Sequence, residues 1–247
     1  MSRLLPLLWL LVLTLSATAC TEDFFVDLEP LERELLGVWV AAERADTAVL
    51  VDFHAGAQRQ WQRTRQRFAG ITLSPAERTA LRATDLWMAG LDGAVRGQNL
   101  PRIRHQLRQL HATVRELRGP VATDHPADLL YTFHEEWGWV SEISHDQMMC
   151  LVEWSEFEDA YRAARSTWRR FEGVSPGYHR ELFPGYATAA VEAEVSHTAL
   201  LRELEEFERR LATGNHTLTT QLTEEVERLF FDHLALLIGY PIGEPAL

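Results

Sequence analysis

The sequence contains no lysine and carries many more acidic than basic groups. Its 24 basic residues are all arginine, they stand against 36 acidic residues, and the formal net charge at pH 7 is −12. A chain of this charge offers no basic stripe to the phosphates of DNA or RNA. The composition therefore argues against a nucleic acid as the partner of this protein.

Short motifs of several catalytic and cofactor-binding classes are also missing. The chain has no CxxCH haem-attachment motif, no glycine-rich phosphate loop, no GxSxG nucleophile elbow and no HExxH zinc motif. No nucleophile with an adjacent base is visible in the sequence. An enzyme is therefore the class of protein that the sequence favours least.

The first twenty residues, MSRLLPLLWLLVLTLSATAC, have the pattern of a secretory signal peptide. Arg3 precedes an apolar run from Leu4 to Leu15, and small residues follow this run. The run is shorter than the ~20 apolar residues that a helix requires to cross a bilayer. We therefore expect an exported chain whose residues 1–19 are removed.

The end of this segment, Ala17-Thr18-Ala19-Cys20, resembles the lipobox of bacterial lipoproteins. The resemblance implies that Cys20 becomes the first residue and carries a lipid (palmitate) anchor. Because threonine follows the cysteine, it also implies an outer-membrane location facing the periplasm. Ala17 stands where leucine is commonest in that motif, and an ordinary signal-peptidase cut after Ala19 is the alternative. Lipidation would leave Cys150 as the only thiol, so packing rather than a disulfide must stabilise the chain.

The spacing of apolar residues predicts an all-α protein. They recur every three or four positions, and no stretch shows the alternation that is typical of strands. Glycine and proline divide the pattern into about six helices, which we expect over roughly 31–69, 74–97, 101–117, 122–171, 187–213 and 214–238. Ser74 and Glu77 have the spacing of a capping box at the start of the second helix.

The two halves of the chain show an internal duplication. A shift of 101 positions aligns Glu34 with Glu135, Gly37 with Gly138, and residues 50–53 with 151–154. We therefore expect an elongated helical bundle of two three-helix units. The predicted segments are a signal peptide (1–19), a lipidated cysteine and tether (20–30), a first repeat (31–119), a second repeat (126–239) and a tail (240–247).

Two Glu-x-x-His sequences, EISH at 142–145 and EVSH at 194–197, raise the question of a metal site. The helical phase places Glu142 and His145 on a solvent-facing row. By contrast, apolar residues flank His197 on both sides, with Glu194 at the edge of their stripe. His233 lies near the centre of the last helix's apolar stripe, so the two histidines should face one interior.

Two other polar residues are expected on core positions. Asp46 is the one polar member of an apolar row in the first helix, and Gln147 is its duplicated equivalent. Together with Glu194, His197 and His233, they form the set that could hold a mononuclear zinc, iron or copper ion. A Glu-x-x-His arm is also similar to the ligand arms of ferritin-like di-iron proteins. The alternatives are histidines that only fix the helix register through hydrogen bonds, and a pocket for an organic ligand.

These observations favour an envelope-anchored helical-bundle lipoprotein that acts as a non-catalytic binding or scaffolding module. Its expected partners are the membrane, through the anchor, and another envelope protein or a small ligand. A metal-binding or metal-handling bundle that uses the core histidines is the alternative function.

Overall fold

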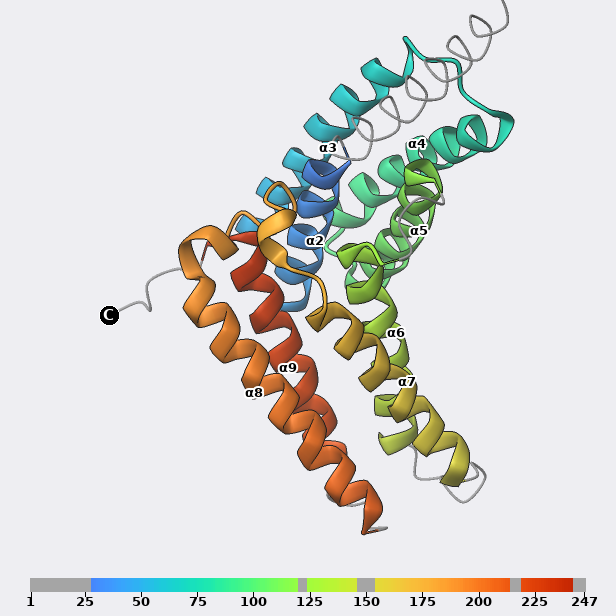
Figure 1. Cartoon of the computed structure of the whole chain (residues 1–247). Coiled ribbons are helices and arrows are strands. Elements are labelled where there is room, and N and C mark those ends of the chain that lie inside the picture. The colour runs from blue at the N-terminus through green and yellow to red at the C-terminus, as the bar shows by residue number, and fades with distance from the viewer. Residues whose placement is uncertain (1–27, 120–123, 146–153, 214–218, 242–247) are drawn as a thin grey trace, which may run out of the picture.

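The computed structural model describes residues 28–119, 124–145, 154–213 and 219–241 (Figure 1). These residues form eight α-helices and one short 3-10 helix and contain no strand, which confirms the all-α prediction. The helices are α2 (Glu29–Glu43), α3 (Thr47–Phe68), α4 (Pro75–Arg96), α5 (Leu100–Arg118), α6 (Pro126–His145), α7 (Trp154–Glu172), η2 (Pro176–Tyr178), α8 (Tyr186–Ala212) and α9 (Thr219–Ile238). Within these residues, none of the helices combines the length and apolar character that a bilayer crossing requires. The predicted signal peptide, Cys20, Gln147 and Cys150 all lie outside the described residues.

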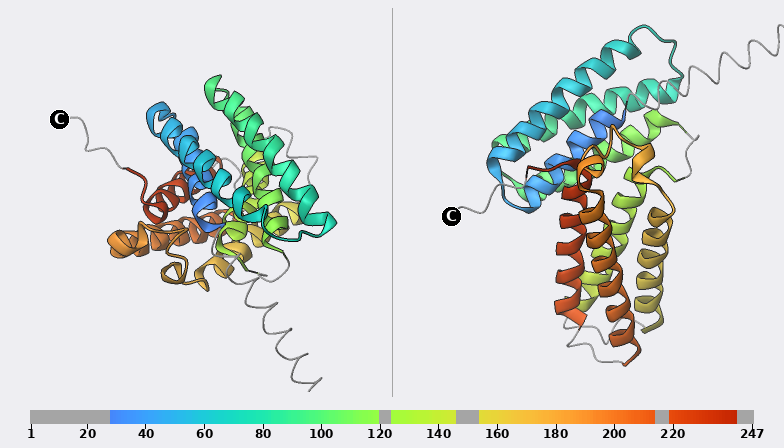
Figure 2. Two further views of the ribbon diagram at one scale, coloured as in Figure 1. Left: turned by 90° about the horizontal axis from the view of Figure 1, so that it is seen from above. Right: turned by 60° about the vertical axis from the view of Figure 1, so that its left-hand side comes forward.

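The helices pack as four consecutive hairpins. α2 packs on α3, α4 on α5, α6 on α7, and α8 on α9. Contacts of α2 with α5 and of α3 with α4 join the first two hairpins, and a contact of α6 with α9 joins the last two. In Figure 2, α6 to α9 run alongside one another, while α3 and α4 cross above their upper end at an angle.

The first predicted helix is wrong as a single element, because the chain turns between α2 and α3. Ala45 has a φ of 53°, a left-handed conformation that ends α2. Asp46 then caps α3, since its carboxylate accepts a hydrogen bond from the Val49 backbone N–H at 3.2 Å. The Tyr240 hydroxyl donates to the same carboxylate at 3.1 Å. Aspartate favours such a cap over a helix interior, because its short side chain satisfies an unpaired backbone N–H. Asp46 is therefore a capping residue, and it lies at a helix start and not at the interior step of one long helix that the apolar row predicted.

The fourth predicted helix is also two helices. α6 ends at His145 and α7 begins at Trp154, and the two pack against each other as a hairpin. Each half therefore contributes four helices and not three, and the expected count of about six is wrong. The apolar periodicity continued from α2 into α3 and from α6 into α7, so it did not reveal that these are separate helices. By contrast, the capping box before α4 is confirmed, with reciprocal hydrogen bonds between Ser74 and Glu77.

A cluster of aromatic side chains joins the two halves into one core. Trp39 of α2 stacks on Tyr131 of α6 with ring centroids 4.7 Å apart. It also makes edge contacts with Phe230 and Phe231 of α9, at 5.8 and 5.3 Å. The halves therefore share buried apolar surface, a point on which the sequence was silent.

The predicted duplication stays a prediction. Both halves have two hairpins in the same order. The aligned glycines, however, have different surroundings. A Cβ added at Gly37 would lie 2.1 Å from the Phe53 ring, whereas one added at Gly138 would meet no atom within 4 Å. Gly37 thus allows α2 and α3 to approach closely, whereas no close approach of another element requires a glycine at position 138.

Substituting Asp46 with alanine tests its capping role. The change removes the acceptor of the Val49 N–H and leaves the Tyr240 hydroxyl without this partner. We expect the free energy of unfolding to fall by about 1 to 2 kcal/mol, which is typical of a lost N-cap. Urea denaturation followed by circular dichroism measures this change. Asp46→Asn, which keeps a capping oxygen, should recover most of the stability, and equal losses in both variants would contradict the capping role.

Candidate functional site

A pocket of about 320 Å³ lies where α7, α8, α9 and η2 meet. Apolar side chains form most of its wall, and two histidines and two glutamates supply polar groups. The lining residues are Phe171, Glu172, Val174, Pro176, Tyr186, Ala193, Glu194, His197, Thr198, His233 and Leu237. An apolar pocket with a few convergent polar groups is the usual form of a small-molecule site.

The structure brings His197 and His233 together in this pocket. Their ring centroids are 5.5 Å apart, although one ring comes from α8 and the other from α9. Trp168 of α7 contacts both rings, and its ring centroid lies 5.3 Å from that of His197 and 5.7 Å from that of His233. The helical phase had placed the two imidazoles toward one interior, and tertiary packing of three helices sets their separation.

His233 is the buried polar group of the pocket. A hydrogen bond to the backbone of Ala193 holds its ring, while its Nδ1 has no hydrogen-bond partner. Burial lowers the pKa of His233 from 6.5 to about 3, and neighbouring His197 adds to this shift, while the bond to Ala193 opposes it. The imidazole is therefore neutral at pH 7, and its buried Nδ1 is an acceptor without a hydrogen bond. An unpaired polar atom of this kind is uncommon in a folded interior.

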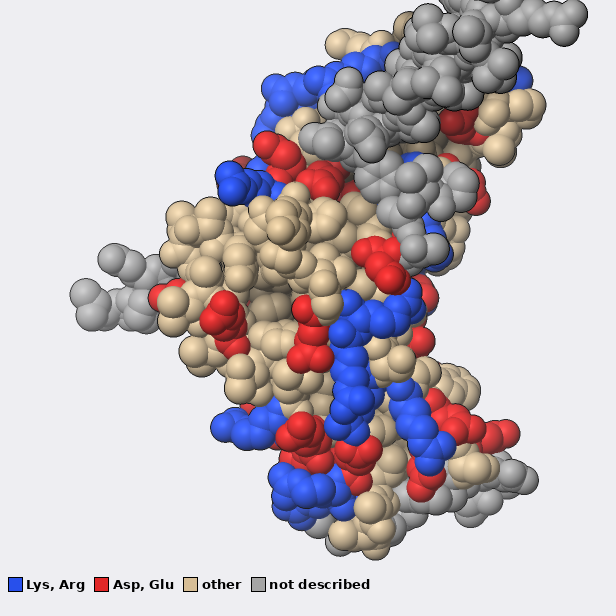
Figure 3. All heavy atoms as spheres, viewed as in Figure 1, with Lys and Arg blue, Asp and Glu red and all other residues tan. Residues whose placement is uncertain are grey.

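His197 and the two glutamates lie toward the mouth of the pocket. His197 Nε2 is 3.1 Å from Glu172 Oε1, and both side chains are partly exposed. Glu194, one turn earlier on α8, is exposed and contributes a second carboxylate to the lining. In Figure 3, uncharged surface covers the region of η2 and the start of α8, and acidic side chains stand beside it.

Among the other described residues of the predicted set, Asp46 does not join this site. Asp46 caps α3 and is absent from the residues that line the pocket. Gln147 lies outside the described residues. Glu142 and His145 are exposed on α6, as the helical phase indicated, and His145 Nε2 lies 3.5 Å from Glu224.

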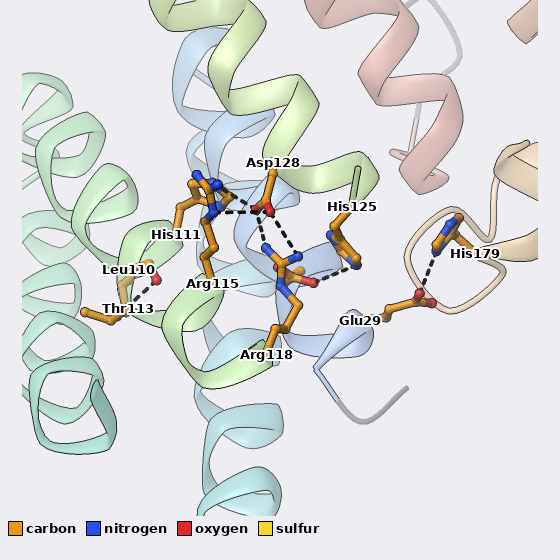
Figure 4. A network of polar contacts seen from close by, with 10 residues as sticks. Glu29, Leu110, His111, Thr113, Arg115, Arg118, His125, Asp128 and His179 are labelled. Atoms are coloured by element: carbon orange, nitrogen blue, oxygen red, sulfur yellow. Dashed lines mark hydrogen bonds and ion pairs between the residues drawn. The ribbon is translucent and has the colours of Figure 1, made fainter. Parts of the chain in front are cut away.

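A second polar cluster, which sequence reasoning missed, lies between α2, α5 and α6 (Figure 4). Arg118, the last residue of α5, places its Nε 3.2 Å from Glu32 of α2 and binds both oxygens of Asp128 of α6. Burial raises the pKa of Glu32 to about 8, although Arg118 acts in the opposite direction. His111 Nε2 lies 3.3 Å from the same Asp128 carboxylate.

This cluster could not be predicted from the sequence, for a physical reason. Glu32 and Asp128 lie in the first turns of helices and Arg118 in a last turn, where such charges normally interact with the helix dipole in solvent. No local pattern distinguishes a solvated terminal charge from one that a neighbouring helix buries. Only the packing of α2, α5 and α6 makes these groups interior.

Searches of protein-family models, of curated protein sequences and of solved structures found no match to this chain. The site's chemistry must therefore carry any functional assignment. That chemistry consists of an apolar wall, a neutral imidazole acceptor and two carboxylates.

The buried state of His233 predicts a pH dependence of stability. The unfolded chain takes up a proton at this residue near pH 6.5, whereas the folded protein does so only near pH 3. The unfolded state therefore binds more protons between these values, and the free energy of unfolding should fall as the pH falls through this range. His233→Gln keeps an N–H for Ala193 but cannot titrate, so its stability should fall less steeply from pH 6.5 to pH 4. Urea denaturation at several pH values compares the two slopes, and identical slopes would contradict the prediction.

Proposed function

We propose that this protein is a binding module that takes a small amphipathic molecule carrying an amine into the pocket between α7, α8 and α9. The unpartnered Nδ1 of buried His233 is the observation that carries the proposal. A ligand N–H or O–H that donates to this atom would satisfy a polar group that is otherwise buried at a cost of about 1 to 3 kcal/mol.

The charge of the lining favours an amine over a carboxylate as the ligand's polar group. Glu172 and Glu194 are the charged residues among the described side chains that line the pocket, and no arginine is among them. A protonated amine near these carboxylates gains electrostatic attraction, while an anion would be repelled. Phe171, Tyr186 and Leu237 supply apolar contact for the remainder of the molecule.

The geometry gives less support to a metal ion held by the predicted histidines. His197 and His233 approach each other, but within the part of the chain that the structure describes they are not part of any group of three convergent metal-ligating side chains. A zinc site usually takes at least three protein ligands. The second Glu-x-x-His arm that a di-iron site needs is exposed on α6. The surroundings of His197 and His233 therefore favour an organic ligand over a metal ion in this pocket.

Matched probes test the proposal. Titrations of the purified full-length chain with 2-phenylethylamine and with phenylacetate compare an amine and a carboxylate on one apolar body. Tryptophan fluorescence reports binding, because Trp168 contacts both histidines of the pocket. We expect the amine to bind at least about tenfold more tightly, a difference of ~1.4 kcal/mol.

Variants separate the pocket from general charge effects. Glu194→Gln and His233→Phe should each weaken binding of the amine about three- to tenfold, or ~0.7 to 1.4 kcal/mol. Glu192→Gln is the matched control, since Glu192 is exposed on the same helix but does not line the pocket. The proposal fails if neither probe binds, if both bind equally, or if the control weakens binding as much as Glu194→Gln.

Export and membrane attachment form a second part of the proposal. The signal-like segment and the lipobox-like Ala17 to Cys20 support a chain anchored by lipid to the outer membrane and facing the periplasm. Cys20→Ser should release the chain from the membrane fraction of cells, and unchanged retention would count against the anchor. A module held in this way would capture its ligand, or an envelope protein, close to the membrane.

A further inference from the structure

We propose that Glu29, His125 and His179 form a binding site for a divalent transition-metal ion of the zinc type. Each side chain offers one ligand atom, and these three atoms all lie within 4.8 Å of one another. This site is separate from the pocket of His197 and His233, and the inference does not depend on the proposed amine ligand.

The three side chains come from segments that are far apart in the sequence. Glu29 is the first residue of α2, His125 directly precedes α6, and His179 directly follows η2. Figure 4 shows that the two imidazoles and the Glu29 carboxylate converge beside the cluster of Arg118 and Asp128. A ligand bound here would link the start of the first half to two segments of the second.

The donor set selects the class of metal. Two imidazole nitrogens and one carboxylate oxygen match zinc and neighbouring first-row ions, whereas calcium and magnesium prefer oxygen ligands alone. Tetrahedral ligands about 2.1 Å from zinc lie roughly 3.4 Å apart. His179 Nδ1 and Glu29 Oε1 are 2.7 Å apart, so an ion would separate this pair slightly while His125 approaches.

The two histidines present suitable groups. The His125 and His179 rings are 5.7 Å apart between centroids and nearly perpendicular, at 78°. The His125 side chain is 1% exposed, and burial of this kind disfavours a charged imidazole. Neutral imidazole is the form that binds metals.

The backbone around His179 is fixed on both sides. Its N–H donates to the Pro176 carbonyl at 3.0 Å, and its carbonyl accepts from the Phe183 N–H at 2.7 Å. Phe183 is fully buried and anchors this short loop to the core. The ligand is thus held before an ion arrives, which reduces the entropy lost on binding.

A further acidic side chain, that of Glu32, lies behind the site. Glu32 Oε2 lies 3.6 Å from His125 Nε2, and Arg118 Nε lies 3.2 Å from the other Glu32 oxygen. A histidine that binds metal commonly has its second ring nitrogen oriented by a carboxylate or carbonyl group. A simple ion pair of Glu29 and His179 would need neither the buried imidazole of His125 nor this support.

The site reaches the protein surface at His179. His179 is 26% exposed, whereas His125 and Glu32 are buried behind it. The outer side can therefore admit the ion and leave one coordination position for water. Three protein ligands with a fourth, open position is an established form of zinc site.

Metal titration of the full-length chain, stripped with a chelator, tests the proposal. Zn²⁺ should bind with a stoichiometry of one, and Co²⁺ should give the intense visible absorption of a tetrahedral site. At a free Zn²⁺ concentration of ~100 times Kd, the melting temperature should rise by about 5 to 10 °C.

Single substitutions locate the ion. His179→Ala and the isosteric Glu29→Gln should each weaken Zn²⁺ binding at least about tenfold while the circular dichroism spectrum of the free protein is unchanged. His105→Ala is the matched control, because His105 is exposed on α5 and away from the site, and it should bind Zn²⁺ as the wild type does. Glu29→Gln keeps the proposal testable even if His179→Ala perturbs the loop.

Other outcomes would overturn the inference. These are the absence of Zn²⁺ and Co²⁺ binding, or binding that both site variants leave unchanged. Loss of Zn²⁺ binding in His197→Ala, with retention in His179→Ala, would move the ion to the other pocket. The amine titration has a separate readout, so failure of the amine proposal leaves this test intact.

Discussion

Arg118→Met is expected to lower the free energy of unfolding by about 3 to 5 kcal/mol, the usual effect of breaking a buried ion pair. The Arg118 side chain is 2% exposed and binds both oxygens of Asp128, which is itself buried. Methionine has a similar volume but no charge, so the Asp128 carboxylate would stay in the interior without its main partner. Urea denaturation at pH 7 measures the loss.

Arg115→Met is the matched control for this experiment. Arg115 lies 3.5 Å from the same Asp128 carboxylate, but its side chain is 64% exposed. Solvent screens such a pair, so this change should cost less than about 1 kcal/mol. A double-mutant cycle with Asp128→Asn should show a coupling energy of at least about 1.5 kcal/mol for Arg118. Equal losses of unfolding free energy in the two arginine variants would show that burial does not determine the strength of the ion pairs with Asp128.

Trp39→Ala is expected to cost about 3 to 5 kcal/mol, because it removes a large side chain from a packed interior. Trp39 is 4% exposed and contacts aromatic rings from both α6 and α9. The loss of stability should be greater than the buried surface of the Trp39 side chain alone predicts, since aromatic pairs contribute about 0.5 to 1.5 kcal/mol beyond burial. Thermal and urea denaturation both report it.

Trp139→Ala provides the comparison for Trp39. Trp139 lies on α6 and is 55% exposed, so the same chemical change should cost less than about 1 kcal/mol. Because Trp39 joins the halves, its loss should also broaden the unfolding transition as the halves become less strongly coupled. A sharp transition with a small loss in Trp39→Ala would contradict a shared core.

The sequence failed to separate α2 from α3 and α6 from α7 for a common reason. Apolar spacing reports which face of a segment is buried, and the same spacing can continue through a turn when the next helix packs on the same core. Asp46 illustrates this point, because it occupies a regular step of the apolar row and yet caps a new helix. By contrast, Ser74 directly precedes Pro75 and lies outside any apolar row. The capping box that it forms with Glu77 could therefore be predicted from the sequence.

The sequence by itself determined the helical class of this protein, the solvent-facing position of Glu142 and His145, and the inward direction of His233. All three follow from helical periodicity, which is a local property of the chain. Tertiary structure alone decided that His197 lies beside His233, that Arg118 is buried between Glu32 and Asp128, and that Glu29, His125 and His179 converge. These contacts join residues from different helices and loops, and their distances depend on how whole helices pack, which local spacing does not encode.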